Sequence, residues 1–112
     1  MNDKILGYHI DLKRPMWKRK YMDSVAERLK NWGFNTILYE VEDKLRYARH
    51  PAIANREAWS REKTLDFADL CRRKGIDIIP LVQSLGHSEY VLKNLGYAHL
   101  RETPECIEQF CP

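Results

Sequence analysis

The sequence predicts an α/β protein in which parallel β-strands alternate with α-helices. Three short apolar runs alternate with segments of helical periodicity, in the order strand, helix, strand, helix, strand, helix. Each of the first two helical segments is followed directly by a glycine, Gly33 or Gly75, where a left-handed C-terminal cap is expected. Parallel strands with right-handed helical crossovers fit a doubly wound open sheet or a (β/α)8 barrel. The pattern alone does not separate these two architectures.

The first strand is expected over residues 5–12, where apolar residues dominate until Asp11, and Pro15 ends it. The first helix is expected from about residue 17 to residue 32, because its apolar residues recur at helical spacing. We expect Trp17 and Trp32 to pack in the core. The apolar stripe of this helix consists of Tyr21, Met22, Val25, Ala26, Leu29 and Trp32.

The second strand is expected over residues 35–41, with Tyr39 packing in the core, and it ends in a run of acids. A loop of roughly seventeen residues follows, over 44–60, and loops of that length in a compact domain are often functional. Trp59, near its end, is either a hydrophobic staple or a platform for a sugar ring.

The second helix is expected over residues 60–74, with Ser60 as its N-cap. The side chains expected to be buried are Leu65, Phe67, Ala68 and Cys71. The third strand is expected over residues 76–82, a short helix over 88–95, and a loop with about one helical turn over 96–112.

Composition excludes several classes of function. The chain has 112 residues and a net charge of +3, with scattered basic residues, so nucleic acid is not an expected partner. No apolar stretch is long enough to span a membrane, and the N-terminus shows no signal region, which favours the cytoplasm. The first strand-to-helix turn is not glycine-rich, which argues against a dinucleotide or P-loop site. The three cysteines lack zinc-site spacing and are expected to be reduced thiols: Cys71, Cys106 and Cys111.

Polar residues follow each predicted strand: Asp11, then Glu42 and Asp43, then Gln83 and His87. Because the carboxyl ends of parallel strands share one edge, these side chains should converge. Carboxylates that face an imidazole suit proton-transfer chemistry. Ordinary structural roles are the alternatives: Asp11 binding loop amides, the two strand-two acids being a solvated loop start, and His87 capping a helix.

The strand ends also carry a resemblance to a known family. Residues 78–93, IIPLVQSLGHSEYVLK, resemble the third-strand region of glycoside hydrolase family 20, the β-N-acetylhexosaminidase family, in its hexosaminidase D-like branch. Residues 9–13, 38–43 and 97–102 resemble the first strand, the second strand and the segment after the third. Four segments in the right order and spacing make the resemblance specific.

The resemblance implies that residues 1–112 are part of a catalytic (β/α)8 barrel, its N-terminal portion of about three βα units. The family hydrolyses terminal β-linked N-acetylglucosamine or N-acetylgalactosamine by substrate-assisted retaining catalysis, and needs no metal or cofactor. The expected partners are therefore N-acetylhexosamine-containing glycans. The catalytic Asp-Glu pair of the family follows the fourth strand, which is expected beyond Pro112, so a chain of these residues is expected to be inactive.

The resemblance also assigns supporting residues. Asp43 and His87 occupy the positions of a hydrogen-bonded chain that orients the catalytic acid. Leu6 stands where many family members have an arginine that binds sugar hydroxyls. The expected substrate-binding residues, including the two arginines that could replace it, are Asp11, Glu42, Gln83, Arg14 and Arg46.

Two other functions stay open at this point. The chain could be a non-catalytic carbohydrate-binding or scaffold protein on a partial barrel, since a whole barrel needs about 250 residues. It could also belong to another class of barrel enzyme, such as a different glycosidase or a lyase. In each case the first and third strands would be sheet edges, through which the chain is expected to self-associate.

Overall fold

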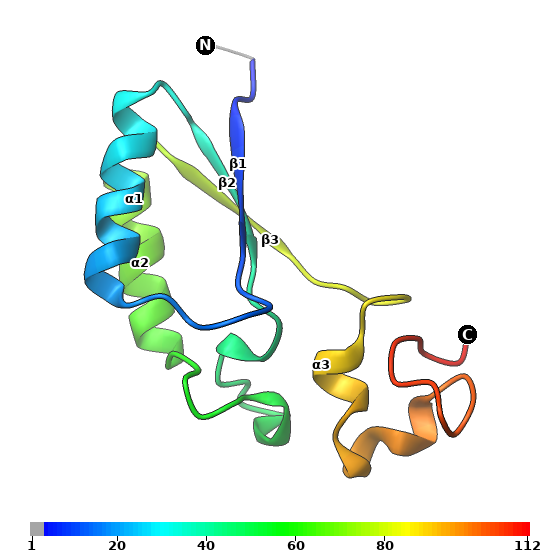
Figure 1. The fold of residues 1–112 in the computed structure, drawn as a ribbon. Coiled ribbons are helices and arrows are strands. Elements are labelled where there is room, and N and C mark those ends of the chain that lie inside the picture. The colour runs from blue at the N-terminus through cyan, green and yellow to red at the C-terminus, as the bar shows by residue number, and fades with distance from the viewer. Residues whose placement is uncertain (1–3) are drawn as a thin grey trace.

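The computed structural model describes residues 4–112 and shows a three-stranded parallel sheet with two long helices on one face (Figure 1). The strand order is β1-β2-β3, so β2 is central and the other two strands are edges. This confirms the predicted α/β class with about three parallel βα units, which here form an open sheet. The main elements are β1 Gly7–Asp11, α1 Arg19–Asn31, β2 Thr36–Glu40, α2 Arg61–Arg73 and β3 Asp77–Leu81.

The helix α1 packs a narrower stripe onto the sheet than its sequence predicts. Met22, Ala26 and Leu29 are almost fully buried, but Tyr21 is 49% exposed and Trp32 is 67% exposed. Tyr21 is turned about 100° from Met22 around the helix axis, and Trp32 is the C-cap, where the chain leaves the helix. The expectation that Tyr21 and Trp32 belong to the buried stripe of α1 was therefore wrong.

The helix α2 begins as predicted, because the Ser60 hydroxyl oxygen accepts a hydrogen bond from the Lys63 backbone N–H at 3.2 Å. Phe67 and Cys71 are fully buried. Trp59 is 4% exposed and packs against Phe67, so it is a packing residue and not a sugar platform. Leu65 was expected to be buried but is 50% exposed. It lines an open groove of about 530 Å³ between α2 and β3, where no other element of residues 4–112 covers the sheet.

The two predicted helix caps have the backbone that requires glycine. Gly33 has φ +85° and Gly75 has φ +72°, both in the left-handed region. Each lets the chain reverse directly into the next strand, which fixes where β2 and β3 begin.

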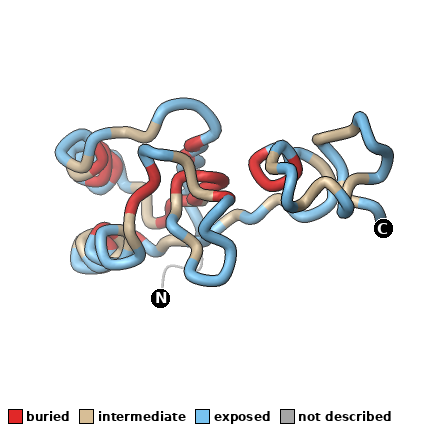
Figure 2. Tube along the Cα trace, turned by 90° about the horizontal axis from the view of Figure 1, so that it is seen from below, coloured by how far each residue is buried: buried red, intermediate tan, exposed pale blue. Residues whose placement is uncertain are grey.

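The segments outside the sheet gather beyond the carboxyl ends of its strands (Figure 1). The long loop after β2 contains two short 3-10 helices, η1 Glu42–Lys44 and η2 Pro51–Ile53. The chain after β3 forms α3 Glu89–Leu92 and η3 Leu95–Leu100. Figure 2 shows that this region has buried residues of its own, apart from those of the sheet. Its cluster consists of Ile53, Tyr90 and Val91, with Tyr47, Tyr97 and Phe110 packed against it.

No helix among residues 4–112 is long and apolar enough to cross a membrane. In the same part of the chain the three cysteines are unpaired, and Cys71 lies in the core as expected.

Candidate active-site edge of the sheet

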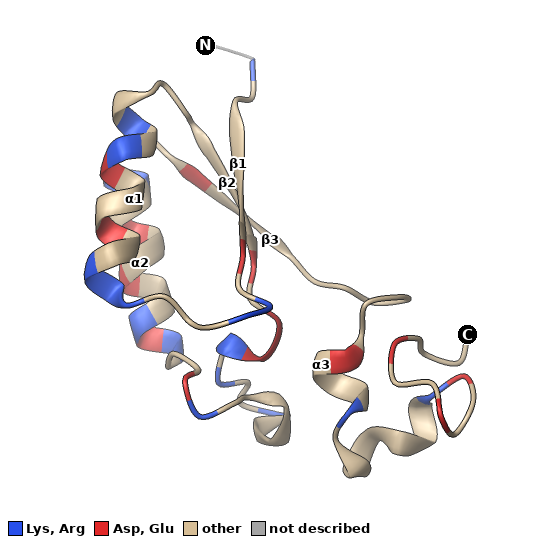
Figure 3. Cartoon of the chain, viewed as in Figure 1, with Lys and Arg blue, Asp and Glu red and all other residues tan. Residues whose placement is uncertain are grey.

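Acidic residues lie at the carboxyl ends of β1 and β2, at one edge of the sheet (Figure 3). The register pairs His9 with Leu38 and Asp11 with Glu40. Because side chains alternate between the two faces of a strand, His9, Asp11 and Glu40 share the face opposite the helices. The predicted convergence of strand ends is therefore produced by register as well as by parallel direction.

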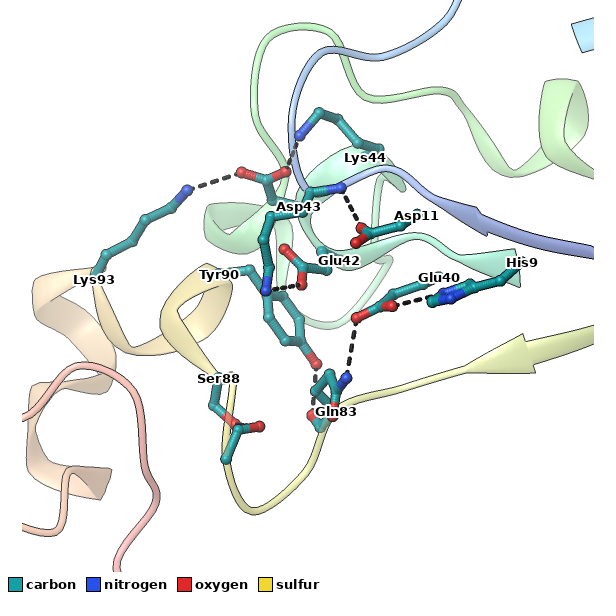
Figure 4. Close-up of polar contacts among 12 residues, drawn as sticks. His9, Asp11, Glu40, Glu42, Asp43, Lys44, Gln83, Ser88, Tyr90 and Lys93 are labelled. Carbon is teal, nitrogen blue, oxygen red and sulfur yellow. Dashed lines mark hydrogen bonds and ion pairs between the residues drawn. The ribbon is translucent and has the colours of Figure 1, made fainter. Parts of the chain in front are cut away.

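Glu40 is at the centre of this edge, and sequence reasoning did not select it as a site residue. It is 4% exposed, and its Oε2 atom lies 2.9 Å from Nε2 of His9. Its Oε1 atom accepts a hydrogen bond of 3.1 Å from Nε2 of Gln83. One carboxylate thus joins side chains from all three strand ends (Figure 4). The feature that could have identified Glu40 as a site residue is its position at the end of the central strand, opposite Asp11.

Asp11 and Glu42 lie close to Glu40, and one carboxylate oxygen of each of the three acids lies within 4.8 Å of those of the other two. Asp11 is exposed and accepts a hydrogen bond of 2.8 Å from the Lys13 backbone N–H, the local role considered as an alternative. Glu42 is buried and has a left-handed backbone with φ +43°. Burial raises the pKa of Glu42 above 4.5, and the negative charges of Glu40 and Asp11 add to this, while Lys13 opposes it.

Asp43 points away from these acids and lies between two lysines (Figure 4). Its Oδ1 atom is 2.5 Å from Nζ of Lys44, and its Oδ2 atom is 2.8 Å from Nζ of Lys93. Burial alone would raise the pKa of Asp43, but hydrogen bonds and charges from the two lysines outweigh it and hold the pKa below 3.8. Asp43 is therefore an ionised, buried carboxylate that ties the segment after β3 to the end of β2.

Two tyrosine hydroxyls fix the backbone around the edge, and neither was selected from the sequence. Tyr47 donates to the backbone oxygen of Glu42 at 2.7 Å, and Tyr90 donates to that of Gln83 at 2.9 Å. Burial raises the pKa of Tyr47 to about 12. Both rings belong to the small cluster beyond the sheet, so that cluster holds the site in place.

His87 lies outside this network. It is exposed, its φ is +54°, and its side chain makes no hydrogen bond or ion pair with any residue from 4 to 112. The structure therefore does not join His87 to Asp43. The role of this pair in supporting a catalytic acid stays a prediction.

The expected sugar-binding arginines are also apart from the cluster. Arg14 and Arg46 are exposed, and within the described chain their side chains have no hydrogen bond or ion pair. Leu6 lies just before β1, five residues from Asp11, or about 16 Å along an extended strand. The cationic group nearest the acids is instead Lys13, whose Nζ lies 3.6 Å from Oε1 of Glu42.

Comparison with known proteins gives the family relation. No family model matches the chain. Hexosaminidase D from Bos taurus is 36% identical over 95 residues, which is 84% of this chain and 28% of the bovine protein. Hexosaminidase D from Homo sapiens is 34% identical over 95 residues, which is 20% of the human protein. The chain is related to the β-hexosaminidases of glycoside hydrolase family 20.

Solved structures of family 20 enzymes have the same fold over part of their length. A chitobiase from Flavobacterium johnsoniae superimposes with a TM-score of 0.74 at 18% identity, covering 86% of this chain and 16% of its own. An exo-β-N-acetylglucosaminidase from Vibrio harveyi, solved with N-acetylglucosamine, gives a TM-score of 0.74 at 15% identity, covering 95% and 21%. The three βα units match a portion of the family 20 barrel.

The chain thus spans about a quarter of the bovine relative and a fifth of the human one. Within its 112 residues no aspartate is followed directly by glutamate, so the Asp-Glu pair of family 20 does not occur in them. These residues form the polar edge at the carboxyl ends of β1, β2 and β3.

Proposed function

We propose that this chain supplies part of the sugar site of a β-N-acetylhexosaminidase, which hydrolyses terminal β-linked N-acetylglucosamine or N-acetylgalactosamine. The observation that carries the proposal is the convergence of Asp11, Glu40 and Glu42 at the carboxyl ends of adjacent parallel strands. In barrel enzymes this edge forms the active site. The likeness to hexosaminidase D over 84% of the chain supports the same function.

In the proposed reaction the acetamido oxygen of the substrate attacks the anomeric carbon, while an enzyme glutamic acid protonates the leaving oxygen. The residues of this chain bind and orient the sugar. Asp11 is exposed and can accept a hydrogen bond from a sugar hydroxyl. Glu40 uses its oxygens to hold Gln83 and His9, which leaves the side-chain Oε1 atom of Gln83 and the Nδ1 atom of His9 for the substrate.

A chimera tests this proposal. The matched 95 residues of bovine hexosaminidase D would be replaced by those of this chain, and hydrolysis of a chromogenic N-acetyl-β-hexosaminide measured. We expect an active chimera whose rate falls about 100-fold with Asp11→Asn, which weakens a hydrogen bond to the sugar, or with Glu40→Gln, which disturbs the side chains of Gln83 and His9 that Glu40 orients. His87→Ala is expected to lower kcat with the fold intact.

The control for the chimera is Asp66→Asn, which alters an exposed acid on α2 and should leave the rate unchanged. Full activity of the Asp11 and Glu40 variants would contradict the proposal, and unchanged kinetics after His87→Ala would remove His87 from the site.

The second candidate is a non-catalytic carbohydrate-binding or scaffold protein, in which the polar edge formed by Asp11, Glu40 and Glu42 would bind a sugar without reacting with it. It predicts that the chain binds N-acetylglucosamine without hydrolysing it. Saturation-transfer NMR with the free sugar separates the two, because a site completed only by further barrel strands should show no saturation transfer in the isolated chain.

We also propose that the isolated chain self-associates through its sheet edges. Ile5 is 68% exposed beside β1, while Ile79 and Val82 are 45% and 65% exposed along β3. Val82→Lys should lower the sedimentation-average mass, whereas Leu95→Lys, at an 85% exposed position away from the sheet, should not. Equal effects of both changes would contradict edge pairing. A cytoplasmic location stays a prediction from the sequence.

A further inference from the structure

The cluster of Asp11, Glu40 and Glu42 has more negative charge than its neighbours balance. One carboxylate oxygen of each lies within 4.8 Å of those of the other two. Lys13 is the ammonium paired with this cluster, with its Nζ 3.6 Å from Oε1 of Glu42, and the His9 imidazole lies 2.9 Å from Oε2 of Glu40. Like charges at this separation repel strongly when they are partly buried. One ammonium and one imidazole against three carboxylates therefore favour a further positive charge at this place.

Glu42 has a buried carboxylate oxygen that receives no hydrogen bond within the described chain. Its side chain is 6% exposed, and its Oε1 atom is inaccessible to solvent and has no hydrogen-bond partner among residues 4–112. It is the one buried side-chain oxygen or nitrogen of the described chain in that condition. Leaving a buried charged oxygen without a partner is strongly unfavourable. The Lys13 ammonium forms an ion pair with this oxygen at 3.6 Å, but the Lys13 side chain is 43% exposed and can withdraw toward solvent when a stronger ligand binds.

Glu40 and Asp11 can each accept a further ligand in addition to their present hydrogen bonds. Each oxygen of Glu40 receives one hydrogen bond, from His9 or from Gln83, and a carboxylate oxygen has two lone pairs. Asp11 receives one backbone hydrogen bond at Oδ1, and its side chain faces solvent. Figure 4 shows the three carboxylates turned toward one another from the ends of β1 and β2.

We propose that Asp11, Glu40 and Glu42 form a binding site for a hard divalent cation such as Ca²⁺. Carboxylate oxygens are the preferred ligands of such ions. One oxygen of each carboxylate lies within 4.8 Å of those of the other two, so a single ion can contact all three. Ca²⁺ tolerates irregular coordination, whereas Mg²⁺ demands near-ideal octahedral geometry and gives up its water reluctantly, so we expect Ca²⁺.

The site would have modest affinity. Three carboxylates supply fewer ligands than the six to eight oxygens that Ca²⁺ takes, water must supply the rest, and Lys13 competes for the same oxygens. We expect a Kd of about 10⁻⁴ to 10⁻³ M, the range of weak carboxylate sites. The cation site does not depend on the proposed glycosidase function, because its test contains no sugar.

The test is a titration of the isotopically labelled chain with Mn²⁺, followed by NMR and then by addition of Ca²⁺. Mn²⁺ should broaden the amide signals of residues 11–13 and 40–43 first, and Ca²⁺ should restore them. Asp11→Asn, at an exposed position that the fold tolerates, should weaken binding about tenfold, because the site loses one of three charged ligands. Lys13→Met should strengthen binding several-fold, since it removes the competing ammonium.

The control variant is Asp66→Asn on α2, which should bind as the unaltered chain does. The proposal is overturned if broadening is as strong along α2 as at the strand ends, if Ca²⁺ does not displace Mn²⁺, or if Asp11→Asn and Lys13→Met leave the affinity unchanged. Glu42→Gln gives a second reading: it should also weaken binding, and unaltered affinity in a folded Glu42→Gln chain overturns the proposal as well.

Discussion

Replacing Asp43 by asparagine should destabilise the chain more than replacing Lys93, the exposed one of its two lysine partners. The Asp43 and Lys44 side chains are 7% and 2% exposed, so Asp43→Asn leaves the Lys44 ammonium buried without a counter-charge. Breaking a buried ion pair in this way costs about 3–5 kcal/mol. Whole domains are stable by only about 5–15 kcal/mol, so the change removes a large share of the total.

Lys93 provides the matched comparison, because it binds the same carboxylate from the surface. Its side chain is 44% exposed, and Asp43 keeps Lys44 when Lys93 is changed to glutamine. An exposed ion pair contributes about 0–1 kcal/mol. The double variant Asp43→Asn with Lys44→Met replaces the buried charges by neutral groups of similar size, and should recover most of the loss.

The assay is urea unfolding followed by the fluorescence of the tryptophans, of which Trp59 is buried, and by far-ultraviolet circular dichroism. We expect the order of stability to be the unaltered chain, Lys93→Gln, the double variant and then Asp43→Asn. The reasoning would be refuted if the free energy of unfolding of Asp43→Asn were within about 1 kcal/mol of that of the unaltered chain. It would also be refuted if Lys93→Gln lost as much stability as Asp43→Asn.

Three further predictions concern the two long helices and the turn after the sheet. Ser60→Ala should cost about 1 kcal/mol in urea unfolding, because it removes the N-cap of α2, whereas Ser24→Ala on the exposed side of α1 should change stability little. Equal effects would show that the cap is not formed. Gly33→Ala should cost about 1–2 kcal/mol through its left-handed backbone alone, since an added Cβ meets no atom within 4 Å there. The comparison is Gly86→Ala, where the backbone is ordinary, and a loss of the same size would exclude the backbone explanation. Burial raises the pKa of Cys71 to about 11, so iodoacetamide should alkylate it far more slowly at pH 8 than the other two thiols, as measured by mass spectrometry. Equal labelling rates in the folded chain would contradict the buried position.

Much of the fold could be predicted from the sequence because local signals agree with one another. The strands, the helices α1 and α2, the Ser60 cap and the two glycine turns each depend on nearby residues. Which side chains are buried near the sheet edges and the helix ends could not be predicted this way. Leu65 and Trp32 have the spacing of core residues, but their exposure depends on which elements lie beside them, and that is a property of the whole sheet.

The same limit applies to the site. Asp11 and Glu42 were predicted as candidates because each follows a strand, and the structure brings their carboxylates together. Glu40 was missed because its role depends on register with β1 and on Gln83, forty-three residues away. Lys93 was missed for the same reason, since nothing near it in the sequence indicates contact with Asp43.

Hydrolysis of a chromogenic N-acetyl-β-glucosaminide by the purified chain tests the central claim most directly. The claim is that these 112 residues hold sugar-site residues of a family 20 β-hexosaminidase but no catalytic acid. The account predicts no turnover above that of buffer at any protein concentration. Turnover that co-purifies with the chain and is abolished by Asp11→Asn would contradict it, because it would place a complete catalytic site within this sequence.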